Sequence, residues 1–114
     1  MDQNHKKIAR LARFVQRDPT DSFSKFALAL ELLKNNEGEK ALQIFESIYR
    51  LDPGYLGIYY HLGKLYETLE QNGRARKLYL EGAELARSRS EQRTLEELEE
   101  ALQNMDTDRN ETED

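Results

Sequence analysis

The stretch YYHLGKLYE, residues 59–67, brings three tyrosines, a histidine and a lysine close together. Such a cluster fits a ligand site, a stacking platform for nucleic acid, or part of a hydrophobic core. Its apolar residues recur at the three- and four-residue spacing of one helix face. The predicted core face carries Tyr59, Leu62, Gly63 and Tyr66, while Tyr60, His61, Lys64 and Glu67 fall outside it.

The same helical spacing recurs along the chain, and no segment alternates apolar and polar residues as a half-buried strand does. Breaks rich in Pro, Gly and Asn separate the periodic segments. Ser88, with Glu91 three residues later, fits a capping box at the start of the last segment. The sequence therefore predicts six helices, which lie near 8–15, 22–34, 41–49, 56–70 and 75–83 and after Ser88 or Ser90.

Several of these residues recur at a separation of 34 positions. The pairs are Pro19 and Pro53, Leu28 and Leu62, Leu32 and Tyr66, Ala41 and Ala75, and Phe45 and Tyr79. A pair of helices that recurs at this length is the unit of a solenoid, in which each repeat buries its apolar face against its neighbours.

Because helix pairs recur every 34 residues, the sequence resembles the tetratricopeptide repeat (TPR) family. As a whole it is similar to the small stand-alone TPR proteins of bacteria. The family motif is a large aromatic residue, a Leu-Gly pair, a tyrosine, then Ala and Phe and a closing Pro. The second repeat matches with Tyr59, Leu62, Gly63, Tyr66, Ala75 and Tyr79; the first matches with Leu28, Ala29, Leu32, Ala41, Phe45 and Pro53. Lys25 stands where the first repeat would have its aromatic residue.

The resemblance implies an all-α, TPR-like solenoid of about six antiparallel helices. We expect one domain over residues 1–105, followed by a disordered acidic tail at 106–114. The domain would comprise an N-terminal half-repeat (6–19), two full repeats (22–53 and 56–87) and a C-terminal capping helix (89–105).

Composition fits a soluble helical protein, with 38% hydrophobic and 34% charged residues among 114. No apolar run reaches the roughly 20 residues of a membrane span, and no secretory signal is evident, so a cytoplasmic location is expected. The net charge of −5 is unevenly spread: residues 1–20 hold five basic and two acidic residues, whereas residues 88–114 hold three basic and ten acidic ones. Such polarity can bear on partners or on head-to-tail association.

The sequence offers little for catalysis. It has two histidines, His5 and His61, and no cysteine, phosphate-binding loop or zinc-ligand spacing. We therefore expect no enzyme, no catalytic residue, no cofactor and no metal site. The basic segment KKIARLARFVQR (6–17) is expected to pack as the half-repeat with its cations in water, rather than to bind nucleic acid or a membrane.

In the TPR family, the first helix of each repeat lines a concave groove that holds a partner segment. The resemblance implies that the groove is lined by Phe23, Phe26, Ala27, Leu30 and Leu33 of the first repeat and by Tyr60, His61, Lys64 and Glu67 of the second. The Lys and Asn clamp of chaperone-binding members is absent, so a hydrophobic or mixed ligand is expected.

The predicted function is that of a non-enzymatic interaction module, an adaptor or scaffold that binds a protein or peptide in this groove. The alternative is a structural homodimer or assembly subunit that self-associates through the apolar groove or the incomplete N-terminal edge. Closure of the groove by the last helix of the same chain, and ligand binding within a larger enzyme assembly, also stay open.

Overall fold

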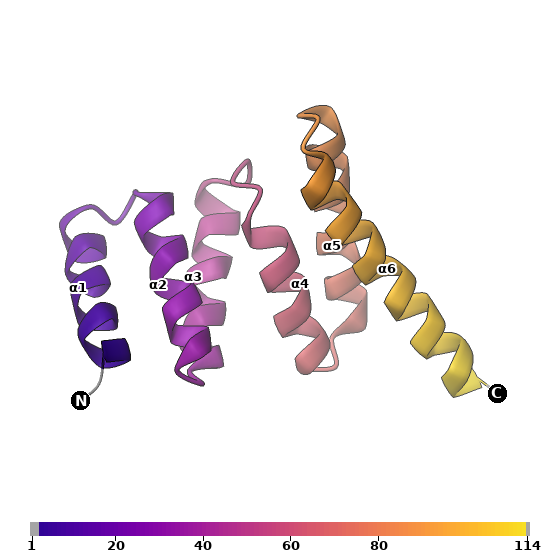
Figure 1. The fold of residues 1–114 in the computed structure, drawn as a ribbon, viewed down its shortest axis with the longest axis horizontal. Coiled ribbons are helices and arrows are strands. Elements are labelled where there is room, and N and C mark those ends of the chain that lie inside the picture. The colour runs from indigo at the N-terminus through magenta and orange to yellow at the C-terminus, as the bar shows by residue number, and fades with distance from the viewer. Residues whose placement is uncertain (1–2, 114) are drawn as a thin grey trace. The chain divides into compact units, whose positions relative to one another are not determined.

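The computed structural model describes residues 3–113, and the side chains of residues 3–106. It contains six helices and, within the described residues, no strand (Figure 1). The helices are α1 (Gln3–Arg17), α2 (Ser22–Lys34), α3 (Gly38–Leu51), α4 (Ile58–Thr68), α5 (Asn72–Ser88) and α6 (Gln92–Glu113). The all-α prediction is therefore confirmed.

The chain forms two compact units, Met1–Ile58 and Tyr59–Asp114, which we call the N-unit and the C-unit. The sequence predicted one domain over 1–105, whereas the boundary between these units falls in the first turn of α4. Each unit is described by itself.

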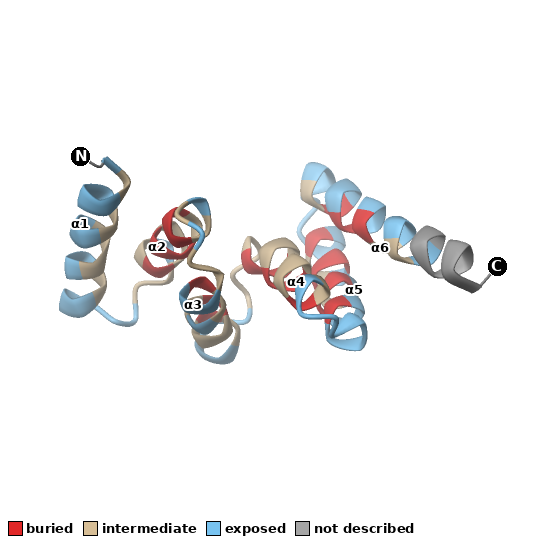
Figure 2. Ribbon diagram, turned by 90° about the horizontal axis from the view of Figure 1, so that it is seen from below, coloured by how far each residue is buried: buried red, intermediate tan, exposed pale blue. Residues whose placement is uncertain are grey.

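In the N-unit, α2 packs against both α1 and α3. Most buried residues of this unit lie on α2 and α3, whereas α1 buries no residue completely (Figure 2). An ion pair fastens α1 to α2, with Lys7 Nζ 3.0 Å from Glu31 Oε1. Lys25, at the aromatic position of the motif, is buried with 7% of its surface exposed. Helix α1 thus packs on α2 without burying any of its own residues completely.

In the C-unit, two glycines let α4 and α5 approach closely. A Cβ atom added to Gly63 would lie 2.3 Å from the ring of Tyr79, and one added to Gly82 would lie 2.5 Å from Tyr59 Cβ. Either distance is shorter than real side-chain contacts allow. The large rings therefore need glycine opposite them, which is the physical reason for the Leu-Gly element of the motif. Helix α5 also packs against α6, where Leu98 is fully buried.

Three helix ends follow one pattern that uses no glycine. Helices α2, α4 and α5 are each followed by a residue in the left-handed region: Asn36 (φ 61°), Glu70 (φ 60°) and Ser90 (φ 58°). The next amide donates back to the carbonyl five residues earlier, for example Glu37 to Leu32 at 2.8 Å. This is the Schellman arrangement, which satisfies the last carbonyls of a helix.

Two details differ from the sequence-based expectation. Ser88 is the last residue of α5, and its hydroxyl donates to the carbonyl of Leu85 at 2.8 Å, so the predicted capping box is wrong. Helix α6 extends to Glu113, whereas the sequence predicted disorder from residue 106. Asp106 Oδ1 lies 2.8 Å from Arg76 Nη1 of α5, a contact that ties this turn of α6 to its neighbour. Asp114 lies outside the described residues.

Candidate functional site

The predicted groove residues of the N-unit all lie on α2, in two adjacent lines along the helix. A helix turns about 100° per residue, so Phe23, Ala27, Leu30 and Lys34 form one line along it. We call this line the α2 stripe. Phe23 is 71% exposed, and Ala27 and Leu30 are half-buried. The side chain of Asp21 accepts the amides of Phe23 and Ser24 at 3.1 and 3.4 Å, which caps the helix and fixes the end that carries Phe23.

Phe26 and Leu33 lie to one side of the stripe and are half-buried. The ring of Phe26 packs against Phe45 (centroids 5.8 Å apart) and Tyr55 (5.3 Å). A Cβ added to Gly57 would lie 3.0 Å from the same ring. Phe26 is therefore mainly a packing residue, although the sequence placed it in the groove.

In the C-unit, Tyr60, His61, Lys64 and Glu67 are all half-buried on α4. The Tyr79 hydroxyl donates to Glu67, and Lys64 Nζ lies 3.9 Å from the same carboxylate. Burial, and then this bond to Glu67, raise the pKa of Tyr79. The Lys64 ammonium also sits 5.5 Å from the centroid of the Tyr60 ring. Glu67 and Lys64 thus take part in a network within the unit, and that network includes a core tyrosine.

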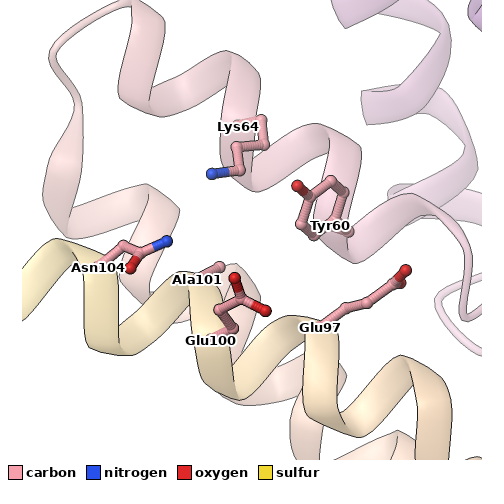
Figure 3. A pocket seen from close by; sticks show the side chains of 6 residues that line it. All are labelled: Tyr60, Lys64, Glu97, Glu100, Ala101 and Asn104. Atoms are coloured by element: carbon pink, nitrogen blue, oxygen red, sulfur yellow. The ribbon is translucent and has the colours of Figure 1, made fainter.

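A pocket of about 230 Å³ opens between α4 and α6. Tyr60 and Lys64 project into it from α4, and acidic and amide side chains of α6 project from the opposite side (Figure 3). Its lining consists of Tyr60, Lys64, Glu97, Glu100, Ala101 and Asn104. The last helix therefore borders this face but leaves it open at the pocket.

His61 lies beside this region. Burial lowers the pKa of His61, and the charge of Glu97 on α6 acts in the opposite direction. Because burial is the larger effect and the ordinary pKa is 6.5, the imidazole is neutral at pH 7. It therefore adds little positive charge to the pocket.

The pocket residues of α6 were not among the predicted site residues. In the sequence, Glu97, Glu100 and Asn104 belong to an acidic helix that was assigned a solvating role. Their spacing places them on one helix face, and this pattern is visible in the sequence. To predict the pocket, however, one must also know that this face turns towards Tyr60, and only the packing of α6 shows that.

Two further properties concern residues 3–113. No helix there is long and apolar enough to cross a membrane. No group of three or more His, Cys, Asp or Glu side chains in the same residues is arranged to hold a metal ion.

Comparison with known proteins gave consistent results. A tetratricopeptide repeat family model matches residues 32–98. A tetratricopeptide repeat domain protein from Salinibacter ruber is 46% identical; its crystal structure has a TM-score of 0.69 and the match covers 71% of this chain and 90% of that chain. For its solution NMR structure the TM-score is 0.67, the identity 46%, and the coverage 74% and 85%.

The crystal structure of MamA, at 21% identity, has a TM-score of 0.72 over 79% of this chain and 53% of that chain, which shows a likeness of fold alone. No curated protein matches the chain. TPR folds generally mediate protein–protein interaction and are generally non-enzymatic. The repeat spacing, the paired helices, the glycine under Tyr79 and the family match lead to one conclusion: this chain belongs to the tetratricopeptide repeat family.

Proposed function

We propose that the protein is a non-enzymatic adaptor or scaffold that binds a helix or extended segment of a partner protein against the α2 stripe. The observation that carries this proposal is Phe23, a large aromatic side chain that is 71% exposed at the capped start of a helix. Exposed aromatic residues on a rigid element are effective binding anchors, because little conformational entropy is lost when they are covered.

The rest of the stripe supports an apolar ligand. Ala27 and Leu30 continue from Phe23 towards the end of α2, where the exposed Lys34 ammonium lies 3.3 Å from Glu31. A partner helix with apolar residues at three- and four-residue spacing would match this line. An acidic residue at one end of that helix would meet Lys34.

A direct test is selection of peptides from a displayed random library on the immobilised full chain. The dissociation constant of the selected peptides is then measured by fluorescence anisotropy. Phe23→Asp should raise it at least about tenfold, because a charge at an apolar contact must be desolvated. Phe26→Asp would be a poor test, since it would also break the contacts with Phe45 and Tyr55.

Leu80→Asp is the matched control, since Leu80 is a 52% exposed apolar residue on α5. Circular dichroism should show the same helical content in the wild type and both variants. If the selected peptides bind Phe23→Asp as tightly as Leu80→Asp, the α2 stripe is not the binding face and the proposal fails.

A further inference from the structure

Helix α1 carries a line of four cations on the face that it turns away from α2. Lys6, Arg10, Arg13 and Arg17 fall within one side of the helix at about 100° per residue, and all four are exposed. We call this line the α1 basic face. The half-buried side of the same helix is apolar and faces α2, and its other cation, Lys7, is already paired with Glu31. Within the described side chains, no carboxylate forms an ion pair with the α1 basic face.

The C-unit pocket presents the opposite charge. Glu97 and Glu100 line it from α6, and neither has an ion-pair partner among the described side chains. Their neighbours differ in this respect: Glu96 accepts the Gln92 amide at 3.1 Å, and Glu99 lies 3.5 Å from Arg87.

Lys64, the one cation among the described residues that line the pocket, lies 3.9 Å from Glu67, so its charge is partly compensated. His61, whose pKa is lowered by burial, adds little positive charge to the pocket. The pocket therefore keeps an excess of negative charge beside an aromatic ring.

We infer that this pocket binds an arginine side chain from the α1 basic face of a second copy of the chain. A guanidinium can stack on the Tyr60 ring while its N–H groups donate to the carboxylates of Glu97 and Glu100. The pocket volume of about 230 Å³ accommodates one such planar group. Arginine suits the site better than lysine because it both stacks and donates in a fork.

The spacing of the two faces also matches. Arg10 and Arg13 are separated by about one helical turn, as are Glu97 and Glu100, so two helices lying side by side can form both pairs. Each copy carries one α1 basic face and one pocket. Because the two surfaces differ, each copy can both donate an arginine and receive one, either from the same neighbour or from two different neighbours.

Charge reversal tests the inference, with sedimentation equilibrium of the full chain as the measurement. At about 0.05 M salt the mean mass of the wild type should rise with protein concentration, and at about 0.5 M salt it should fall towards the monomer because screening weakens the contact. Two double variants remove one charged partner each: Arg10→Glu/Arg13→Glu and Glu97→Arg/Glu100→Arg. Each should raise the dissociation constant of self-association at least about tenfold. An equimolar mixture of these two variants should associate again, since each supplies the charge that the other requires.

Three controls make the outcome specific. Arg50→Glu, which reverses an exposed cation on α3, should leave association unchanged, and circular dichroism should show intact helices in every variant. Phe23→Asp should also associate normally, which separates this contact from the α2 stripe. The inference is overturned if the wild type stays monomeric at low salt. It is equally overturned if only the α1 variant loses association, or if the mixture fails to restore it, because the basic face would then bind some other anionic surface.

Discussion

Gly63 and Gly73 lie in neighbouring helices, yet their surroundings are opposite. A Cβ at Gly63 would meet the Tyr79 ring at 2.3 Å, whereas a Cβ at Gly73 would have no atom within 4 Å besides its own helix. The Tyr79 ring cannot easily move aside, because it is fully buried and its hydroxyl is bonded to Glu67. The two glycines thus have different reasons to be there, one steric and one not.

We expect Gly63→Ala to lower the free energy of unfolding by about 1–3 kcal/mol, since it overpacks the contact between α4 and α5. Gly73→Ala should raise the same quantity by about 0.5 kcal/mol, because alanine loses less backbone entropy than glycine in a helix. Urea denaturation followed by circular dichroism measures both. Equal effects of the two substitutions would show that helix propensity, and not close approach, governs Gly63.

At the scale of elements, the attachment of α1 rests on a charged contact as well as on apolar packing. The Lys7 ammonium, together with Lys34 at 3.3 Å, surrounds the buried carboxylate of Glu31. These contacts hold the pKa of Glu31 below its ordinary value of 4.5, with the bond from Lys7 as the largest cause. The ionised carboxylate is therefore part of what keeps α1 on α2.

This contact predicts a pH dependence. Because the pKa of Glu31 is lower in the folded protein, its contribution to stability is fully present above pH 4.5 and is lost as the pH falls through the folded value. Thermal unfolding midpoints measured from about pH 7 to about pH 3 should therefore fall more steeply in the wild type than in Glu31→Gln. Glu39→Gln, which alters an exposed carboxylate of α3, should leave the slope of the wild type unchanged. Parallel curves for the wild type and Glu31→Gln would refute the role of this pair.

At the scale of the whole molecule, the two compact units bury separate sets of large side chains. Phe45 and Ile48 are fully buried in the N-unit, and Tyr79 and Leu98 in the C-unit. In repeat proteins stability is approximately a sum over units and their interfaces, and a terminal helix with a polar outer face is needed to cover the last one. Helix α6 has this role for α5, and its outer face is acidic.

Leu98→Ala should lower the stability of the C-unit by about 2–5 kcal/mol, because it removes a fully buried side chain and leaves a cavity between α5 and α6. Amide hydrogen exchange followed by NMR can report each helix separately. Protection in α5 and α6 should fall, while protection in α2 and α3 should change less. Leu80→Ala, at an exposed site of α5, should change the stability of the C-unit by no more than about 0.5 kcal/mol. A uniform loss of protection across all helices would instead mean that the units unfold together.

The sequence alone determined the fold class, the family and most helix positions. The reason is that fold class, family and helix positions depend on local periodicity and on a motif that recurs every 34 residues. Leu62, Gly63 and Tyr79 are examples of such motif positions. It predicted less well where side-chain contacts decide the outcome. Helix ends are an example, since the left-handed positions fall on Glu70 and Ser90 as well as on Asn36.

Tertiary structure decided which candidate residues are exposed enough to contact a partner. Phe23 and Phe26 look equivalent in the sequence, but only Phe26 meets the rings of Phe45 and Tyr55, because the turn between the two positions points one outwards and the other towards α3. The pocket likewise arises from two helices that are distant in sequence, where Glu97 and Glu100 come to face Tyr60. A periodic pattern specifies which face of a helix is buried, whereas the packing of one helix on another specifies which neighbour each remaining side chain meets.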